Sequence, residues 1–252
     1  MAGKSDDVMR IFHLGNIPKA PQAMQEVLTT LRTVADVQKV FNYTSLNDLV
    51  VRGPATQVAL AEYLVKSFDI APGSVTSVPE YPYKPPVIAP GAPANEVAQV
   101  FYLANMKTPQ EVQEILTVLR TVNDIQKVFM YMPLNAIAVL TSDSNMAAVA
   151  WVIKSLDIPA TAKPDASAGP HEYVMSVSSP SIYNVIRVFY PLHIKTPQGI
   201  QETLTLLRSK LYIQKVFNYT TLPALVVRGS ADQITKAEQL IQAQDQVAKA
   251  TP

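Results

Sequence analysis

The chain carries one pattern of hydrophobic and polar positions three times over. Each repeat opens on a short stretch in which apolar and polar residues alternate, a spacing that predicts a β-strand. These first strands are expected over residues 8–14, 97–103 and 185–191. Apolar residues three and four positions apart follow each strand and predict an amphipathic helix. The helical stripe consists of Val112, Ile115, Leu116, Leu119 and Val122 in the second repeat and of Val27, Leu28, Leu31 and Val34 in the first. Leu31, Leu119 and Leu207, one in each repeat, are expected to be buried between this helix and the sheet.

The start of this helix is marked best in the second repeat. Thr108 precedes a proline suited to the first helical position, and Glu111 completes a capping box. The third repeat keeps the threonine as Thr196 but has Gly199 where the glutamate would stand, and the first repeat has Ala20 before its proline. We therefore expect a complete capping box only in the second repeat.

Two more strands and a second helix complete the unit. In the first repeat, residues 37–44 and 49–52 predict strands around a short polar turn, and a helix follows Pro54 and ends near Asp69. Each unit then has the order βαββα, an α+β fold in which two helices cover one face of a three-stranded sheet. Val37, Phe41 and Tyr43 set the alternation of the second strand. We expect Phe41 on the face that the helices cover and Val40 on the opposite, open face.

The repeats recur at a fixed distance. The tetrapeptide Gln-Lys-Val-Phe begins at Gln38, Gln126 and Gln214, so both offsets are 88 residues. Between the copies lie proline-rich stretches that favour extended spacers. We predict three separately folded modules over 8–69, 97–157 and 185–245, joined by linkers over 70–96 and 158–184. In the second linker, partial alternation over 171–178 allows one extra strand.

Composition narrows the function classes. Hydrophobic residues make up 48% of the chain, there is no cysteine, and the net charge is +1. The modules carry net charges of +1, −1 and +3, whereas a surface that follows phosphates would be basic in every copy. The absence of cysteine removes disulfides, thiolate catalysis and zinc–cysteine sites. No run of apolar residues is long enough for a membrane-spanning helix.

Catalytic signals are absent from the sequence. His13, His171 and His193 do not recur between modules, and we read them as structural. Neither a glycine-rich phosphate loop nor a G-x-S-x-G elbow is present. Glu111 and Glu114 are read as part of a solvated helix face. We therefore predict a non-enzymatic protein, with no catalytic, metal-binding or cofactor-binding residue and no cofactor.

Aromatic residues recur on the second strand and leave one alternative open. Aromatic rings beside lysines on a sheet can stack bases, as in single-stranded nucleic-acid binders, although core packing is the commoner role. KH-type nucleic-acid modules have a similar element order, but their G-x-x-G loop is missing here. The repeated aromatic pairs are Phe41 and Tyr43, Phe129 and Tyr131, and Phe217 and Tyr219; the neighbouring lysines are Lys39, Lys127 and Lys215.

The second half of each module resembles a known family. The stretch Asn47–Gly53, followed by a helix ending in Phe68-Asp69, is similar to the N-terminal ring-building domains of bacterial secretins. The third module resembles it through Leu225–Gly229 and ends in Gln244-Asp245, with Pro223 for the asparagine. The second keeps Asn135 and Leu156-Asp157 but loses the glycine. Three tandem copies of such a domain are indicated.

The resemblance implies periplasmic modules of secretion systems that pack laterally into rings or dock other components. Since no membrane-barrel domain follows in this sequence, we expect a scaffold or accessory of the cell envelope rather than a gated channel. The first seven residues lack the apolar segment of a signal peptide, so an exported form is expected to have lost its leader. The expected partners are proteins or further copies of the chain, not nucleic acid.

The second and third strands carry more apolar residues than one buried face requires. Such a surplus predicts either a contact surface or a cover supplied by the linker residues Tyr81, Tyr83, Val87 and Ile88. We favour the contact surface. The candidate assembly residues are Val40, Phe41, Val128, Phe129, Val216 and Phe217.

Overall fold

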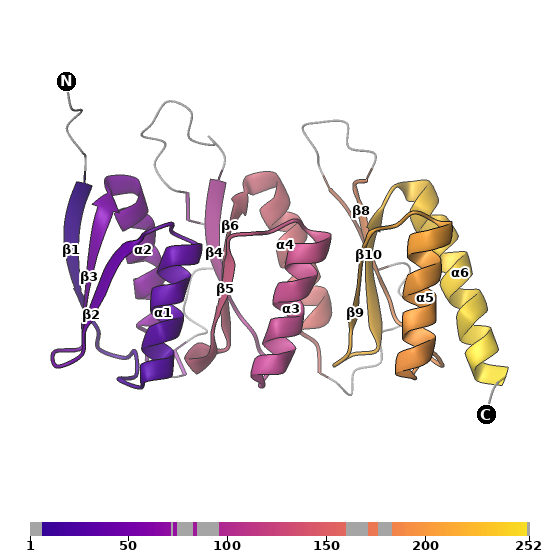
Figure 1. Cartoon of the computed structure of the whole chain (residues 1–252), viewed down its shortest axis with the longest axis horizontal. Coiled ribbons are helices and arrows are strands. Elements are labelled where there is room, and N and C mark those ends of the chain that lie inside the picture. Colours follow the sequence, from indigo (N-terminus) through magenta and orange to yellow (C-terminus); the bar gives the residue numbers. More distant parts are fainter. Residues whose placement is uncertain are drawn as a thin grey trace, which may run out of the picture. The chain divides into compact units, whose positions relative to one another are not determined.

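The computed structural model of the chain describes residues 7–71, 73–74, 83–84, 96–159, 171–175 and 183–250 (Figure 1). The first βαββα series consists of β1 (Asp7–His13), α1 (Pro21–Thr33), β2 (Lys39–Tyr43), β3 (Asp48–Pro54) and α2 (Ala55–Phe68). The second consists of β4 (Glu96–Tyr102), α3 (Pro109–Val122), β5 (Val128–Tyr131), the short 3₁₀ helix η2 (Met132–Leu134), β6 (Ala136–Ser142) and α4 (Asp143–Leu156). The third consists of β8 (Val185–Phe189), α5 (Pro197–Lys210), β9 (Lys215–Tyr219), β10 (Ala224–Gly229) and α6 (Ala231–Ala250).

The predicted element order is confirmed in all three repeats. The strands form three antiparallel sheets with the orders β1-β3-β2, β4-β6-β5 and β7-β8-β10-β9. The extra strand foreseen in the second linker is β7 (Glu172–Val174), which pairs with the edge of β8. Within the described ranges, no helix is both long enough and apolar enough to cross a bilayer.

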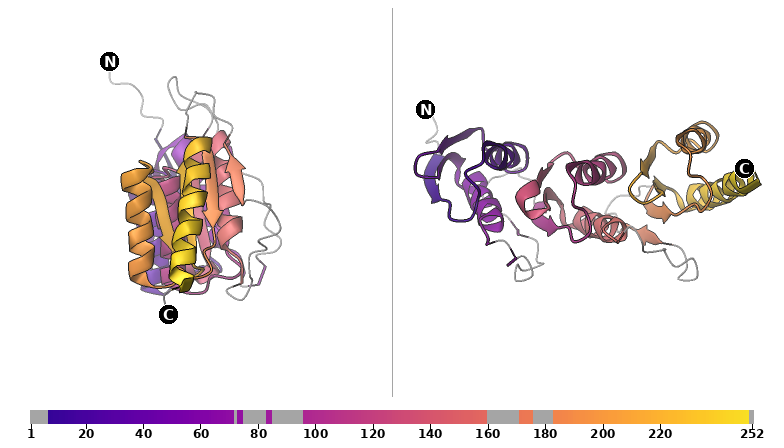
Figure 2. Two further views of the ribbon diagram at one scale, coloured as in Figure 1. Left: turned by 90° about the vertical axis from the view of Figure 1, so that its right-hand side faces the viewer. Right: turned by 90° about the horizontal axis from the view of Figure 1, so that it is seen from below.

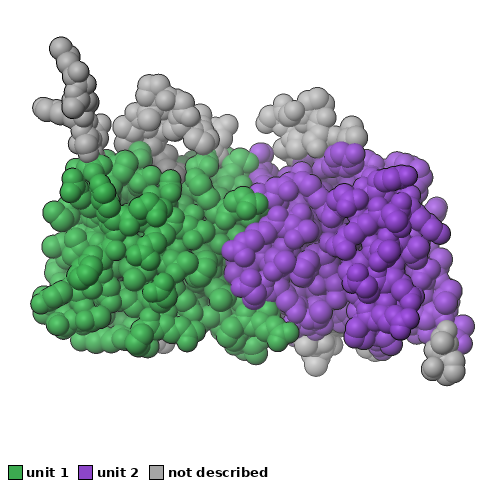
Figure 3. All heavy atoms as spheres, in the orientation of Figure 1, with its two compact units in different colours: residues 1–112, 125–143 green, residues 113–124, 144–252 purple. Residues whose placement is uncertain are grey.

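The chain divides into two compact units that do not follow the repeat boundaries (Figure 3). Unit 1 comprises residues 1–112 and 125–143, and unit 2 comprises residues 113–124 and 144–252. Unit 1 thus contains the first sheet, α1, α2 and the second sheet, whereas unit 2 contains most of α3, α4, the third sheet, α5 and α6. The separate folding of three modules with the boundaries given above stays a prediction.

Helix starts follow the capping signals of the sequence. At α3 the Glu111 carboxylate accepts a hydrogen bond from Thr108 N at 2.8 Å, and Thr108 Oγ1 accepts one from Glu111 N at 3.3 Å. Hydrogen bonds from the backbone of Lys107 and Thr108 lower the pKa of Glu111. Thr196 caps α5 through Gly199 N, while Ala20 makes no side-chain cap at α1. The capping box predicted at the first helix of the second repeat is therefore confirmed, and the structure adds one at α6, where Ser230 and Gln233 bond each other's backbone N–H groups.

An aspartate after the second helix fastens the loop that leads into the first helix. In unit 1 the Asp69 carboxylate accepts hydrogen bonds from the N–H groups of Gly15, Asn16 and Ile17 at 2.5–2.9 Å. In unit 2 the equivalent Asp245 accepts from the N–H groups of Leu192, His193 and Ile194 at 2.7–3.2 Å, and from the His193 ring. The aspartate of the sequence motif, and His193, therefore hold the fold together locally.

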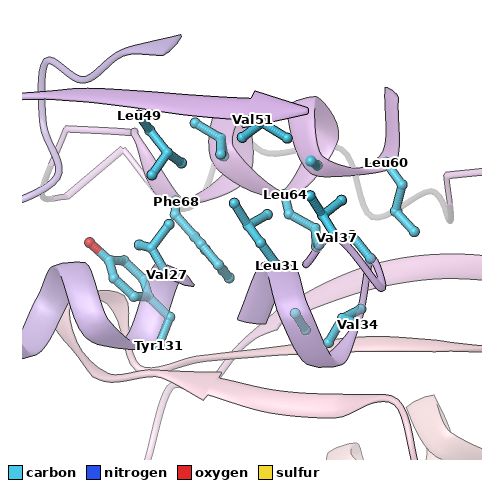
Figure 4. Packing of buried hydrophobic residues seen from close by; sticks show 14 of the residues in the cluster. Val27, Leu31, Val34, Val37, Leu49, Val51, Leu60, Leu64, Phe68 and Tyr131 are labelled. Carbon is cyan, nitrogen blue, oxygen red and sulfur yellow. The ribbon is translucent and has the colours of Figure 1, made fainter. Parts of the chain in front are cut away.

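Each unit has its own apolar core. In unit 1 the helices α1 and α2 pack on the inner faces of β2 and β3, where Leu31, Leu49 and Phe68 are almost fully buried (Figure 4). In unit 2 Leu207 packs in the equivalent way with Leu225 of β10. The predicted burial of the stripe leucines is confirmed, since Leu31, Leu119 and Leu207 have no exposed surface.

The second strand faces the other way from the sequence prediction. Val40 is half-buried against the core of unit 1, whereas Phe41 and Tyr43 point to the opposite face and are exposed. The reason is that β2 begins at Lys39. Val37 is buried in the loop before the strand, so its burial says nothing about which strand positions face the helices.

Candidate functional site

One face of the first sheet carries none of the helices that the structure describes (Figure 2). Its apolar side chains point away from α1 and α2: Met9 is 68% exposed, Ile11 53%, Phe41 65% and Tyr43 49%. The register brings them together, because Ile11 and Phe41 both flank Val50 of the central strand β3. We call Met9, Ile11, Val50, Phe41 and Tyr43 the first outer face. A contiguous exposed patch of this kind marks an interaction surface.

Charged side chains border the first outer face. Lys39 Nζ and Arg52 Nε lie 3.6 Å and 3.5 Å from the same Asp7 carboxylate oxygen. At the other end, His13 Nδ1 lies 2.7 Å from the Asp48 carboxylate, and the His13 side chain is largely exposed. The apolar centre therefore has a polar rim, which is the usual anatomy of a protein interface.

The second sheet shows what such a face looks like when it is covered. In unit 1 its outer face belongs to the same hydrophobic core as α1 and α2. Tyr131, equivalent to Tyr43, is 1% exposed and stacks on Phe68 of α2 with ring centroids 4.4 Å apart (Figure 4). Ala138 stands where the first sheet has Val50, and its small side chain leaves room for the helices. The core positions on this face are Ala98, Val100, Tyr131, Ala136, Ala138 and Leu140.

Two polar contacts fix the helix pair on this second sheet. Glu26 of α1 is 7% exposed, and its Oε2 accepts a hydrogen bond from Met132 N at 2.8 Å. Tyr102 at the end of β4 donates its hydroxyl to the backbone oxygen of Ser67 at 2.8 Å. Burial and the neighbouring Tyr63 raise the pKa of Tyr102 to about 12, so the hydroxyl keeps its proton and remains a donor.

The same two contacts recur in unit 2. Glu114 of α3 accepts from Thr220 N at 2.9 Å and also bonds the Thr220 hydroxyl. Tyr190 donates its hydroxyl to the backbone oxygen of Ser155 at 2.9 Å, and burial raises its pKa to about 12. These residues lie 88 positions after Glu26, Met132, Tyr102 and Ser67. The chain therefore makes the same contact, between a helix pair and the outer face of a sheet, once in each unit.

The interpretation of Glu114 as part of a solvated helix face was wrong. Glu114 is half-buried and bonds two groups of Thr220, and Glu26, at the same repeat position, is buried. The sequence does contain the signal, since glutamate occupies positions 26, 114 and 202 at the repeat spacing. The role of this glutamate as an acceptor becomes visible only with the loop that faces each helix, at Met132 and Thr220.

In unit 2 an arginine of the sheet adds an ionic contact. Arg228 Nη1 donates to the Asp124 carboxylate at 3.2 Å and to the backbone oxygen of Val122 at 3.0 Å. Lys215 pairs with the same carboxylate. The Arg228 side chain is only 10% exposed, whereas that of Asp124 is 55% exposed, so the arginine is buried and its carboxylate partner faces solvent. Arg52 and Lys39 occupy the same positions on the first sheet, where Asp7 takes the place of Asp124.

The predicted assembly residues lie on different faces. Val128 and Val216 are fully buried, and Val40 is half-buried on the helix side of its sheet. Phe129 and Phe217 are half-buried, which leaves Phe41 as the exposed member of the set. Their part in assembly stays a prediction. Of the four linker residues proposed as a cover, Tyr83 pairs with Ala98 and stacks on Tyr63 at 4.8 Å; Tyr81, Val87 and Ile88 lie outside the described residues.

Among the described residues no three histidines, aspartates or glutamates gather as a metal site would require. An open groove of about 740 Å³ lies between α5 and β9 in unit 2, and its charged lining side chains are Lys195 and Arg208. His171 lies edge-on to the Tyr190 ring at 5.4 Å, and His193 bonds Asp245.

Similar chains were found among solved structures. No family model matches the sequence, and no curated protein matches it. The chain is similar to Aeromonas hydrophila ExeD, with 16% identity and a TM-score of 0.23 over 96% of this chain and 41% of that one. It is similar to the N-terminal domain of the secretin XcpQ from Pseudomonas aeruginosa, with 12% identity and a TM-score of 0.25 over 60% of this chain and 62% of that one.

A chain of the a/eIF2alpha-aDim2p-rRNA complex from Pyrococcus horikoshii OT3 is also similar, with 11% identity and a TM-score of 0.34 over 64% of this chain and 89% of that one. The present chain spans less than two thirds of the length of the ExeD chain and of the XcpQ chain, 41% and 62%. The solved structures similar to this protein thus include secretin N-terminal domains of secretion systems.

Proposed function

We propose that this protein is a non-enzymatic assembly module of the bacterial cell envelope that works by binding proteins, as the periplasmic domains of secretion-system secretins do. The observation that carries the proposal is the first outer face. On the second and third sheets Phe129 and Phe217 are half-buried and Tyr131 and Tyr219 are buried, whereas Met9, Ile11 and Phe41 are more than half exposed. A face built to the same plan as two covered faces is suited to being covered by a partner.

The residues around the first outer face suit a protein partner. Apolar side chains occupy its centre, and removing apolar surface from water supplies about 25 cal/mol per Å². The bordering Lys39 and Arg52 already pair with Asp7, so a partner does not have to neutralise them. The periplasmic location rests on the resemblance of Asn47–Gly53 and Phe68-Asp69 to the secretin ring-building domains.

Binding of single-stranded nucleic acid is less well supported. Base stacking would need the aromatic pair of each module to be accessible. Tyr131 and Tyr219 are buried, so only Phe41 and Tyr43 are available on an outer face. A repeated stacking platform is therefore not present.

A crosslinking experiment in cells tests the proposal. We expect a photoreactive amino acid in place of Phe41 to crosslink to protein in the envelope fraction. The matched control places it at Leu192, which is 68% exposed in unit 2 and lies outside the first outer face. Crosslinks to nucleic acid at position 41, or equal protein crosslinking at both positions, would contradict the proposal.

A further inference from the structure

We infer that the partner of the first outer face is a second copy of this chain, which covers it with the helix pair α5–α6. The inference rests on the proposed function and names the partner of the same surface. It starts from the contact that the chain makes twice within itself. In unit 1 the pair α1–α2 lies on the outer face of the second sheet, and in unit 2 residues of α3 and α4 bond the outer side of the third sheet.

The third module offers the same anchor as the first two. Glu202 of α5 stands at the repeat position of Glu26 and Glu114. Gln198 holds the Glu202 carboxylate at 2.9 Å, as Gln22 holds that of Glu26 at 3.2 Å. Glu202 is exposed and so remains open to a further partner.

The acceptor loop for this glutamate also has a counterpart. Thr44, in the exposed turn after β2, stands where the other sheets have Met132 and Thr220, whose N–H groups bond Glu26 and Glu114. A second copy would therefore place the Glu202 carboxylate against the N–H group of Thr44. The pair also carries Leu206, which is half-buried and stands at the repeat position of the fully buried Thr30 of α1. Leu206 supplies an apolar contact to Ile11 and Phe41.

The ionic contact that Asp124 makes with Arg228 and Lys215 in unit 2 has no counterpart between the α5–α6 pair and the first sheet, and both surfaces differ accordingly. The loop after the first helix has Asp36, Asp124 and Tyr212 at equivalent positions, all with a positive φ of 55–59°. In unit 2 Asp124 serves the cations Arg228 and Lys215. The α5–α6 pair carries Tyr212 in its place, and on the first sheet the corresponding cations already meet Asp7. The α5–α6 pair, which has Tyr212 in place of the aspartate, therefore suits the first sheet, whose Lys39 and Arg52 already pair with Asp7.

Such a contact joins two different surfaces and therefore continues from copy to copy. Head-to-tail contacts close into a ring when the rotation between copies allows it and otherwise extend into a filament. In an open filament, the copy at one end would keep an uncovered first outer face, and the copy at the other end would keep an uncovered α5–α6 pair.

Complementary variants test the inference. We expect the wild-type chain to self-associate in sedimentation velocity as its concentration rises from about 1 μM to about 1 mM. Ile11→Asp removes the sheet end, and Glu202→Arg with Leu206→Asp removes the helix end; each variant alone should associate about 100-fold more weakly. Mixed together, they retain one good sheet and one good helix pair, so they should form a one-to-one dimer and nothing larger.

Other outcomes overturn the inference. If the helix-end variant associates as the wild type does while Ile11→Asp is monomeric, the sheets pair with each other. A wild-type chain that stays monomeric throughout the series also overturns it. In that case, crosslinking from position 41 to a different envelope protein would leave the proposed function standing. Circular dichroism of each variant monitors folding, and Phe41→Asp, at a more exposed position, replaces Ile11→Asp if that variant is unfolded.

Discussion

The first and third sheets have nearly the same sequence and different surroundings. The strands β2 and β9 are both Lys-Val-Phe-Asn-Tyr, and the stretch Leu-Val-Val-Arg-Gly stands in both β3 and β10. Yet Tyr43 is 49% exposed while Tyr219 is fully buried, and the side chain of Arg52 is 56% exposed against 10% for Arg228. Identical strands can therefore present either a buried or an open face. What decides is whether a helix pair lies on that face.

The comparison shows that an apolar outer face is a common feature of the repeated module and is not confined to the first sheet. A sheet that is always covered needs apolar residues on both faces, and the strand sequences supply them in every copy. In the first copy the chain provides no such helix pair among its described residues, and the apolar face remains. The same kind of surface therefore stabilises the fold where it is covered and is available for assembly where it is open. Substitutions at equivalent positions of the first and third sheets should separate these two roles.

The largest difference is expected between the two equivalent tyrosines. Tyr219→Ala should destabilise the protein by about 3–5 kcal/mol, because it leaves a cavity at a fully buried position. Tyr43→Ala should cost less than about 1 kcal/mol, because its side chain is half exposed. Chemical denaturation of both variants measures the difference. Equal losses would show that the two faces are covered alike.

Much of this architecture follows from the sequence alone. The repeat offset, the βαββα order, the capping box at Thr108 and the burial of the stripe leucines are local signals, and the structure bears them out. The direction of Val40 was predicted wrongly because a buried loop residue, Val37, was counted as part of the strand. The cover of the second and third outer faces was missed because it comes from a helix pair far away in the chain, as the bond between Glu26 and Met132, 106 residues apart, shows.

The next largest effect concerns the two arginines. Arg228→Ala should cost about 1.5–3 kcal/mol, because it removes a buried arginine that bonds the Asp124 carboxylate and the backbone oxygens of Val122 and Tyr183. Arg52→Ala should cost about 0–1 kcal/mol, since its pairing with Asp7 is exposed to solvent. Urea denaturation of the two variants gives the comparison. A loss at Arg52 as large as that at Arg228 would contradict it.

Asp69 and Asp245 make equivalent hydrogen bonds in the two units, so their replacement should have the same effect on stability in both. Asp69→Asn and Asp245→Asn each weaken several hydrogen bonds from backbone N–H groups, and each should cost about 1–3 kcal/mol. Burial on its own would raise the pKa of Asp245, but hydrogen bonds from the His193 backbone and ring and from the N–H groups of Ile194 and Leu192 together lower it.

The lowered pKa has a consequence for acid stability. A carboxylate with a lower pKa in the folded state stabilises the protein above its unfolded-state pKa, and that stabilisation is lost as the pH falls through the folded-state pKa. The wild-type chain should therefore lose stability in this acid range more steeply than Asp245→Asn. Thermal melts across a series of acidic buffers measure the two slopes. Parallel slopes would show that the carboxylate does not contribute through its charge.

The smallest effect is expected where a buried tyrosine makes no polar contact. Burial and the nearby Glu26 and Asp69 raise the pKa of Tyr131, and within the described part of the chain its buried hydroxyl has no hydrogen-bond partner. Tyr131→Phe should therefore change stability by less than about 0.5 kcal/mol, or increase it, because nothing bonded is lost. Tyr102→Phe is the matched control, since it removes the bond to Ser67 and should cost about 1 kcal/mol. A larger loss for Tyr131→Phe than for Tyr102→Phe would mean that stacking on Phe68 is not what holds the helix pair on the second sheet. The cover of an outer face would then depend on polar anchors more than on its apolar centre, and Thr44 rather than Phe41 would become the first position to change on the open face.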